Sequence, residues 1–231
     1  MKPVVVRNIP RPAPALSARL RDLGVATLHE AIGRRGLMKP YMRPIWPGAK
    51  IAGPAVTVLT HPGDNWMIHV AVEQCRKGDV VVAACSADNT DGMFGDVLAT
   101  TFMARGIVGL VIDAGVRDVA NLAEMKYPVW SRAISAKGTI KATLGSVNIP
   151  VICAGVHVMP GDIIVADDDG VVVVPHAQAE SAVAVAEQRE AAEIEKRRRL
   201  AAGELTLDID KMREPLQKLG LTYVDDLSDL K

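Results

Sequence analysis

Two short motifs carry the residues whose types and spacing could support chemistry in this chain. Gly95-Asp96 opens one helical pattern and Arg117-Asp118 opens the next, so that Arg117 follows Asp96 by 21 residues. A pair of carboxylates suits a hard divalent cation such as Mg²⁺ or Mn²⁺, which takes few protein oxygens and keeps several waters. A guanidinium beside that cation can neutralise an oxyanion. The combination predicts a site for a small 2-oxo acid on a divalent cation.

Each residue of such a site has an expected role. Asp118 is expected to bind the cation directly, and Asp96 to hold a water molecule of its coordination shell. Arg117 is expected to stabilise the enolate oxygen that develops when a carbon–carbon bond is cleaved. The amides of Val97 and Leu98 lie in the first turn of the expected helix, where unpaired N–H groups can hold a carboxylate. A structural role stays open, because Asp is a favoured N-cap residue and an Arg–Asp pair can pin a loop.

The elements that must position these residues alternate between strand and helix. The pattern predicts a strand over residues 79–86, a helix over 96–105 that ends at Gly106, a strand over 107–112 and a short helix from Asp118. Parallel strands connected in this way send their loops to one edge of the sheet, where open α/β sheets hold ligands. Both motifs are therefore expected to converge there.

The flanking segments predict further helices and strands. They are helices over 16–23, 27–33 and 65–75, and strands over 51–59, 128–131 and 150–152. Residues 36–48 are expected to form a loop. Thr27 and Glu30 have the spacing of a capping box, which predicts that Thr27 begins the second helix.

Three consecutive acids, Asp167, Asp168 and Asp169, resemble a cation cluster at first sight. Valine-rich runs over 163–166 and 171–174 flank them, and Gly170 follows directly. Asp-Gly between two such runs predicts a tight hairpin turn. These acids are therefore left out of the predicted site.

The C-terminal region has the pattern of a long helix rich in Ala, Glu and Arg over 177–202, followed by a less regular tail over 205–219. The helix is thinly apolar, so it gains little by folding back on its own core. We expect it to pack on a neighbouring subunit. The predicted organisation is an α/β catalytic domain over 1–175 and a C-terminal helical tail over 176–231.

Composition argues against several classes of function. The 27 Lys and Arg residues balance the 27 Asp and Glu residues, so no attraction to nucleic acid or to an anionic membrane is expected. Apolar runs are far shorter than the roughly 20 residues of a membrane-spanning helix, and Arg7 and Pro10 interrupt the N-terminal one. A cytoplasmic protein is expected. The three cysteines are too scattered for a disulfide framework or a metal site and are expected to be buried apolar residues.

No competing catalytic motif stands out in the sequence. It contains no glycine-rich phosphate loop, no Gly-x-Ser-x-Gly elbow and no zinc-type histidine spacing. His61 and His69 are eight positions apart across a turn and are expected to be structural.

Five motifs together resemble a known family. They are Gly-Val-Ala-Thr-Leu-His-Glu-Ala (24–31), Pro-Gly-Asp-Asn-Trp-Met (62–67), Gly-Asp-Val-Leu-Ala (95–99), Gly-Val-Arg-Asp (115–118) and Ala-Asp-Asp-Asp-Gly-Val-Val (166–172). From about Val25 to the tail, the chain resembles the 4-hydroxy-4-methyl-2-oxoglutarate/4-carboxy-4-hydroxy-2-oxoadipate aldolases. These belong to the RraA-like superfamily, which includes the ribonuclease E activity regulators. The Gly-Asp and Arg-Asp motifs are shared by the superfamily, whereas the flanking motifs resemble the aldolase branch.

The resemblance implies a fold and an activity. The fold would be a swivelling β/β/α domain with a mixed sheet, assembled as a homotrimer or a homohexamer. The activity would be that of a class II pyruvate aldolase, which uses a divalent metal and releases pyruvate together with oxaloacetate or a second pyruvate. Oxaloacetate decarboxylation would be a side activity, and the pathway would be the degradation of protocatechuate and gallate.

The resemblance also implies roles for single residues. Asp118 matches the metal ligand, Asp96 the acid that holds metal-bound water, and Arg117 the residue that binds pyruvate and its enolate. Val97 and Leu98 match the residues whose amides bind the carboxylate.

Three further residues match positions around the family's site. Asn65 and Lys141 match positions on its substrate side, although Lys141 could equally be a surface lysine. A glutamate from a neighbouring subunit, matched by Glu193, would approach the metal waters. The same helix carries Glu187, Glu190 and Glu195, so the choice among these four glutamates stays open.

Two other functions remain open on the sequence. One is a non-catalytic regulator that binds an RNA-processing enzyme, and the other is a dedicated oxaloacetate decarboxylase. The sequence does not decide the preferred C4 substituent, the physiological metal or the general base.

Overall fold

Short runs of Val, Ile and Ala form the strands of a mixed sheet. The computed structural model describes residues 2–229. Among these residues, nine strands form one sheet and two form a separate hairpin. The strands are β1 Arg43–Pro44, β2 Ile51–Thr60, β3 Val80–Cys85, β4 Gly92–Phe94, β5 Gly109–Val116, β6 Val129–Ile134, β7 Ser146–Val147, β8 Val151–Cys153, β9 Val156–Val158, β10 Ile163–Asp167 and β11 Gly170–Val174.

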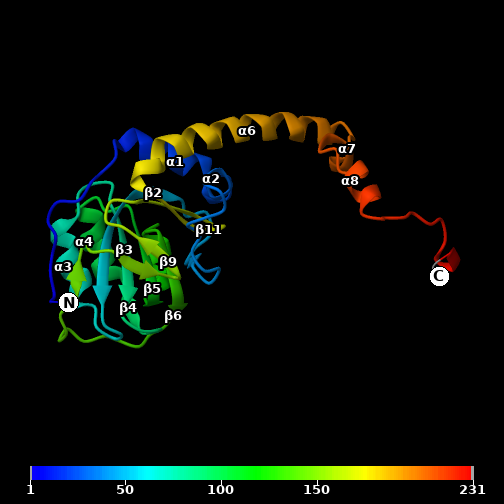
Figure 1. Cartoon of the computed structure of the whole chain (residues 1–231). Coiled ribbons are helices and arrows are strands. Elements are labelled where there is room, and N and C mark those ends of the chain that lie inside the picture. Colours follow the sequence, from blue (N-terminus) through cyan, green and yellow to red (C-terminus); the bar gives the residue numbers. More distant parts are fainter. Residues whose placement is uncertain (1, 230–231) are drawn as a thin grey trace. The chain divides into compact units, whose positions relative to one another are not determined.

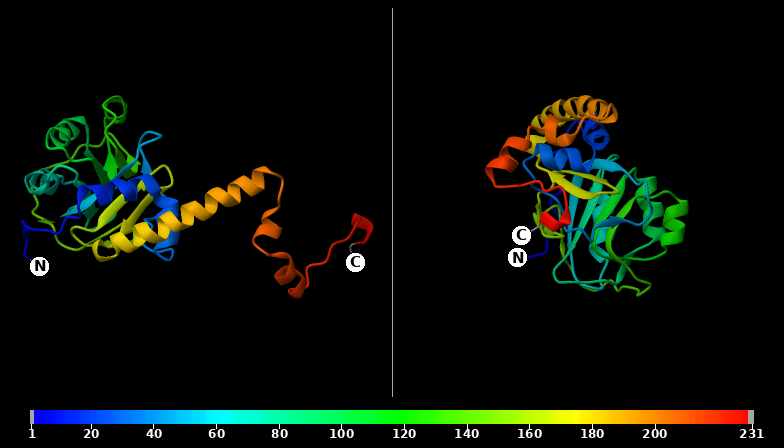
Figure 2. Two further views of the ribbon diagram at one scale, coloured as in Figure 1. Left: turned by 90° about the horizontal axis from the view of Figure 1, so that it is seen from above. Right: turned by 90° about the vertical axis from the view of Figure 1, so that its right-hand side faces the viewer.

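The centre of the sheet is parallel and its borders are antiparallel. The main path runs β1-β6-β5-β3-β2-β10-β11, with β4 paired to β5 and β7 paired to β2. Strands β2, β3, β5 and β6 are parallel neighbours, while β1, β10 and β11 join antiparallel. The predicted α/β class with a mixed sheet is therefore confirmed (Figures 1 and 2). The loops that follow the parallel strands open at one edge of the sheet.

Alternation along the strands divides the apolar side chains between two faces. One face carries Val81 and Leu110, together with the buried sides of α3 (Trp66–Gln74), α4 (Asp96–Ala104) and α5 (Val119–Glu124). The opposite face carries Val82 and Val111, with Trp130 and the β8–β9 hairpin against it. Both faces are thus covered, which explains why the parallel strands are almost entirely apolar.

A third apolar cluster lies on the β10–β11 hairpin. Helices α1 (Pro14–Leu23) and α2 (Val25–Ala31) and the first part of α6 (Ala179–Ala201) pack there, through side chains such as Leu20, Leu28 and Val183. The predicted hairpin is confirmed, with Asp167 paired to Gly170 at its tip. Asp168 accepts a hydrogen bond from the Gly48 amide, and Arg43 donates to the backbone carbonyl of Asp169 at 2.6 Å. These acids therefore organise the hairpin turn.

The predicted capping box at Thr27 is wrong. Helix α2 begins two residues earlier, at Val25, with Gly24 at the N-cap. The Val25 amide donates to the Asp167 carboxylate at 2.8 Å, so the hairpin supplies the acceptor that Thr27 was expected to provide. Glu30 instead pairs with Arg34 at 3.0 Å.

Other boundaries differ from the predicted ones by a few residues. The loop expected over 36–48 contains β1, and β4 lies in the stretch before α4. Strand β5 extends to Val116, so the Arg-Asp motif follows it at once. Cys75 and Cys153 are buried and Cys85 is partly buried, and burial raises the pKa of Cys75 and Cys85 to about 12.

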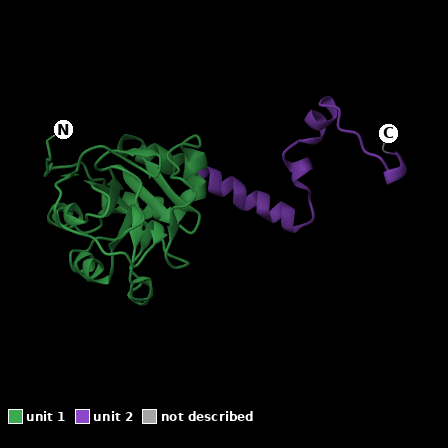
Figure 3. Cartoon of the chain, turned by 90° about the horizontal axis from the view of Figure 1, so that it is seen from below, with its two compact units in different colours: residues 1–187 green, residues 188–231 purple. Residues whose placement is uncertain are grey.

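The chain divides into two compact units, residues 1–187 and 188–231 (Figure 3). The first contains the sheet and its helices. The second contains the rest of α6 and the short helices α7 (Thr206–Ile209) and α8 (Arg213–Lys218). Among the described residues, no helix combines the length and apolar character needed to cross a membrane.

Candidate active site

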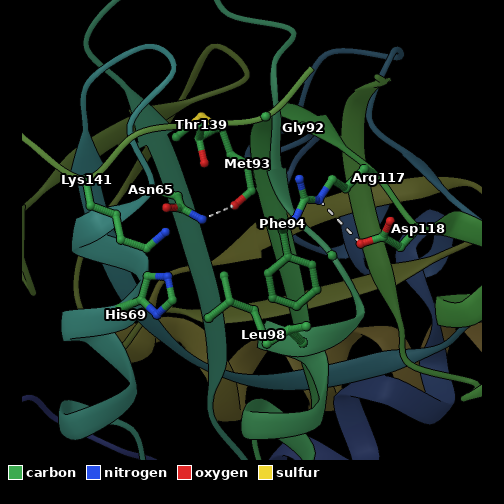
Figure 4. A pocket seen from close by; sticks show the side chains of 13 residues that line it. Asn65, His69, Gly92, Met93, Phe94, Leu98, Arg117, Asp118, Thr139 and Lys141 are labelled. Carbon is green, nitrogen blue, oxygen red and sulfur yellow. Dashed lines mark hydrogen bonds and ion pairs between the residues drawn. The ribbon is translucent and has the colours of Figure 1, made fainter. Parts of the chain in front are cut away.

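A cavity of about 230 Å³ opens at the carboxyl ends of the parallel strands. Loops after β2, β3, β5 and β6 contribute its walls, which is the position expected for a ligand site in an α/β sheet. Asn65, Val97, Leu98, Arg117, Asp118 and Lys141 all line it. Figure 4 shows Arg117 and Asp118 on one side of the cavity and Lys141 with His69 on the other.

The Arg-Asp motif turns sharply at the end of β5. The Arg117 amide donates to the Phe94 carbonyl at 2.9 Å, which holds this turn beside β4. Asp118 then takes a left-handed conformation with φ 54° and ψ 35° and begins α5. Arg117 Nε lies 3.4 Å from Asp118 Oδ2, and the two side chains are 47% and 34% exposed. A pair this exposed adds little stability, so the left-handed backbone is not explained by the ion pair alone.

Asp96 is the first residue of α4 and lies near the Arg-Asp motif. Asn121 of α5 donates to Asp96 Oδ2 at 2.7 Å. This hydrogen bond, with help from the Val97 amide and the charge of Arg117, lowers the pKa of Asp96 against the opposing effect of desolvation. Asp96 is therefore ionised at neutral pH, although it does not itself line the cavity.

The N-terminus of α4 supplies backbone donors to the cavity. Gly95 is the N-cap residue of α4 and has no side chain that could cap the helix. The first helical hydrogen bond runs from Ala99 N to Gly95 O at 3.0 Å. The amides of Val97 and Leu98 come before Ala99 and therefore have no helical acceptor, and the Val97 amide bonds to the Asp96 carboxylate. Anions are stabilised at this end of a helix. Both residues line the cavity, and Val97 is 75% exposed whereas Leu98 is 7% exposed.

A buried carboxylate, Asp64, connects two segments that line the cavity. Asp64 is 1% exposed and accepts hydrogen bonds from the amides of Trp66, Ala142 and Thr143 at 2.7–2.9 Å. Burial raises its pKa, but these backbone donors outweigh burial and hold the pKa below its usual value. Asp64 thereby ties the start of α3 to the loop that carries Lys141.

Asn65 occupies the N-cap position of α3 but makes no side-chain cap. Its Nδ2 donates to the Met93 carbonyl at 3.0 Å, while its Oδ1 is buried without a hydrogen-bond partner among the described residues. An unsatisfied acceptor at a cavity wall is costly unless a ligand donates to it.

The sequence interpretation missed His69 as a cavity residue. His69 lies one turn after Asn65 on α3, and it lines the cavity together with Lys141. Burial and then the charge of Lys141 lower its pKa, so the imidazole is neutral at neutral pH. The four-residue spacing from Asn65 was the available signal, because such residues share a helix face. No spacing or motif in the sequence indicates Asn121 as the hydrogen-bond partner of Asp96.

Glu193 lies on α6 in the second compact unit, whereas the residues that line the cavity all belong to the first. It pairs with Arg189 at 3.1 Å and with Arg197 at 3.6 Å along its own helix. Glu187 pairs with Arg19 and Glu195 with Arg198, whereas Glu190 has no ion pair among the described residues.

The donor set at the cavity fits a hard cation that keeps most of its waters. The described residues contain no group of three or more His, Cys, Asp or Glu side chains placed to hold a metal ion. Asp118 offers one exposed carboxylate, and the ionised Asp96 lies nearby. One or two carboxylates with several waters are the usual environment of Mg²⁺, and zinc would require more nitrogen or sulfur ligands.

Comparison with known proteins identifies the family. The model of the RraA-like family, described as Aldolase/RraA, matches residues 20–173. A protein of Halalkalibacterium halodurans named "Putative 4-hydroxy-4-methyl-2-oxoglutarate aldolase" is 30% identical over 173 residues, which cover 75% of this chain and 82% of that protein. The chain therefore belongs to the RraA-like family.

Solved structures agree with this assignment. Streptomyces coelicolor RraAS2, described as an unusual member of the RNase ES inhibitor RraA protein family, superposes with a TM-score of 0.72 at 30% identity, covering 82% of this chain and 99% of that one. The RNA-processing inhibitor RraA from Thermus thermophilis gives a TM-score of 0.58 at 26% identity, covering 65% of this chain and 91% of that one. The relatives thus carry names from both an aldolase branch and a regulator branch.

Proposed function

We propose that this protein is a class II pyruvate aldolase. It would cleave 4-carboxy-4-hydroxy-2-oxoadipate to pyruvate and oxaloacetate, or 4-hydroxy-4-methyl-2-oxoglutarate to two molecules of pyruvate. The observation that carries the proposal is the convergence of Arg117, Asp118, Val97 and Leu98 on one small cavity. The name of the Halalkalibacterium relative supports the same activity.

The chain would divide the binding of a 2-oxo acid between two elements. The carboxylate would lie at the N-terminus of α4, where the Val97 and Leu98 amides would donate to it. The keto oxygen would lie toward Arg117, at the end of β5. A bound Mg²⁺ or Mn²⁺, held by Asp118 directly and by Asp96 through water, would polarise the keto group.

Cleavage moves one proton and one electron pair. The C4 hydroxyl would give its proton to a hydroxide held by Asp96, which becomes water, and C4 would become the carbonyl carbon of the departing product. The electrons of the C3–C4 bond pass into the enolate of pyruvate, whose oxygen the Arg117 guanidinium stabilises. That water would then protonate C3, which completes pyruvate and restores the hydroxide. Oxaloacetate decarboxylation would form the same enolate by breaking its C3–C4 bond, with carbon dioxide as the departing group and no hydroxyl proton to remove.

The test uses the purified full-length protein with Mg²⁺ and either substrate, with pyruvate measured by a coupled dehydrogenase. Pyruvate release that requires the metal and stops on thorough chelation is the expected result. Activity that survives chelation would exclude the metal role, and a lysine adduct trapped by borohydride would indicate Schiff-base chemistry. Oxaloacetate in a parallel reaction separates a dedicated decarboxylase from an aldolase, since only the aldolase also cleaves the hydroxy acids.

A second candidate function is regulation of ribonuclease E-type RNA processing. The names of the Streptomyces and Thermus structures favour it. In that case the purified protein would bind and inhibit such a ribonuclease while releasing no pyruvate from any of the three substrates. We propose, in addition, a cytoplasmic homotrimer or homohexamer in which a C-terminal glutamate, Glu193, approaches the site of a neighbouring subunit.

A further inference from the structure

A second cavity, of about 350 Å³, lies between the N-terminal segment, α1, β2 and the turn that joins α3 to β3. Its volume is within the range of about 300–1,000 Å³ that is usual for small-molecule sites. No residue that lines it also lines the candidate active site. The proposed aldolase mechanism therefore makes no use of this cavity.

The lining combines an apolar wall with basic side chains. The apolar wall comes from Pro12, Pro14, Ala18, Ala52 and Pro54. The polar part of the lining carries four cationic side chains and one carboxylate, namely Arg11, Arg21, Arg76, Lys77 and Asp79. In a chain whose formal net charge is zero, such a local excess of positive charge is informative.

Arg11 is held rigidly at the cavity wall. Its Nε and Nη2 donate to the Asp79 carboxylate at 2.9 and 2.8 Å, and Nη2 also donates to the Gln74 carbonyl at 3.1 Å. The Arg11 side chain is 13% exposed and that of Asp79 is 1% exposed. Arg11 Nη1 is buried and has no hydrogen-bond partner among the described residues. Two fixed N–H donors on that nitrogen are therefore unused.

Arg76 and Lys77 supply positive charge that the protein does not neutralise. Both are exposed, and neither side chain makes an ion pair within residues 2–229. Arg21, by contrast, pairs with Asp22 at 2.9 Å, and Asp79 is already neutralised by Arg11. Among the described residues, the cavity lining thus offers two cations without an ion-pair partner, Arg76 and Lys77. They lie in the same lining as the Arg11 guanidinium, whose orientation Asp79 fixes.

We propose that this cavity binds a small organic anion, with a carboxylate or phosphate group attached to a flat apolar body. The anionic group would lie between Arg76 and Lys77, beside the Arg11 guanidinium, because guanidinium groups recognise both kinds of oxyanion. The apolar body would pack against the three prolines. Inorganic anions would bind less tightly, since they leave the apolar wall exposed to water.

Calorimetric titration of the full-length protein at fixed ionic strength tests the proposal. The probes are benzoate, phenyl phosphate and the uncharged benzyl alcohol. Saturable binding of at least one anion, with no binding of benzyl alcohol, is expected, and the tighter anion identifies the preferred group. Absence of saturable binding by both anions, or equal binding of benzyl alcohol, would overturn the proposal.

Variants then locate the binding. In R76Q/K77Q the dissociation constant of the better anion should rise at least about tenfold, as expected for one lost charge-assisted hydrogen bond. Ala18→Phe, which fills the cavity without changing charge, should abolish binding. The matched control R7Q/K126Q removes the same charge from two exposed positions outside the cavity and should bind normally. Equal weakening in both double variants would show nonspecific electrostatics and refute the site.

One further variant separates the two cavities. Arg117→Ala changes the candidate active site, so binding in the second cavity should persist unchanged in it. Loss of anion binding in Arg117→Ala would place the anion in the active site and overturn the inference. Because this readout is binding and not turnover, it is independent of whether the protein is an aldolase.

Discussion

Gly95 lies so close to Asp118 that an added Cβ would overlap Oδ2 of its carboxylate. The Gly95 φ of −158° is an extended value open to any residue, so space and not backbone freedom requires glycine here. The Gly-Asp motif therefore does two things. It begins α4, and it leaves room for the carboxylate supplied by the Arg-Asp motif. This contact connects two motifs that lie 21 residues apart.

Gly95→Ala should displace the Asp118 carboxylate while the fold is retained. We expect the Mg²⁺ concentration for half-maximal pyruvate release to rise about tenfold or more, equivalent to about 1.4 kcal/mol of metal binding. Steady-state assays across a metal titration measure it. Gly138→Ala is the matched control, because its Cβ would have its nearest neighbour at an ordinary 3.7 Å. Equal metal requirements in the two variants would contradict the proposed ligand role.

Arg117→Ala and Asp118→Ala should each nearly abolish pyruvate release. Loss of a group that stabilises developing negative charge costs about 10²–10³ in turnover. Pyruvate release by the purified variants measures the effect, with circular dichroism to verify folding. Arg35→Ala, which changes an exposed arginine outside this cavity, is the control. Near-normal turnover of either folded variant would rule out the assignment.

The sequence was informative where a residue and its partner lie close along the chain. Valine runs predicted the strands, and the order of strand and helix predicted that Asp96 and Arg117-Asp118 follow neighbouring strands. Partners distant in sequence were not predictable. The Asp167 carboxylate that begins α2 is 142 residues from Val25. Tertiary contacts of this kind override a local capping signal.

The candidate site likewise combines residues that the sequence indicates with partners that it does not. The motifs indicated which residues to consider, but single-residue patterns do not reveal Asn121 as the partner of Asp96 or Asp64 as the anchor of the Lys141 loop. Asp64 looks like an ordinary turn residue in the sequence. Its role follows from burial, since a buried carboxylate must receive hydrogen bonds and here receives them from a segment 78 residues away.

Asp64→Asn should weaken both stability and its dependence on pH. The pKa of Asp64 is lower in the folded state, so its contribution is present above the unfolded pKa of about 3.9 and is lost as the pH falls through the folded pKa. We expect the variant to lose about 1–3 kcal/mol at pH 7. Urea unfolding between pH 2 and 7 measures this, and the difference from wild type should shrink at the acid end. The exposed Asp169→Asn is the control, and an equal loss at every pH would refute the linkage.

His69 should titrate below its ordinary range because of burial and the nearby Lys141. Lys141→Met removes one of the two causes, so the midpoint of His69 should rise but stay below 6.5, the ordinary value. Imidazole resonances followed by NMR across pH 4–8 measure the midpoint. Lys126→Met, an exposed lysine that does not line the cavity, should leave it unchanged. An unchanged midpoint in Lys141→Met would mean that the Lys141 charge does not act on the imidazole.

The glutamates of α6 allow a test of the proposed contribution from a neighbouring subunit. Glu193 is already paired with Arg189 and Arg197, whereas Glu190 has no ion pair among the residues described. If Glu193 approaches the metal waters of a neighbouring subunit, Glu193→Gln should raise the Mg²⁺ requirement several-fold, because a neutral amide holds those waters less strongly. Glu190→Gln should leave the requirement unchanged. The metal titration of pyruvate release distinguishes them, and the reverse order would transfer the role to Glu190, one turn earlier on the same helix.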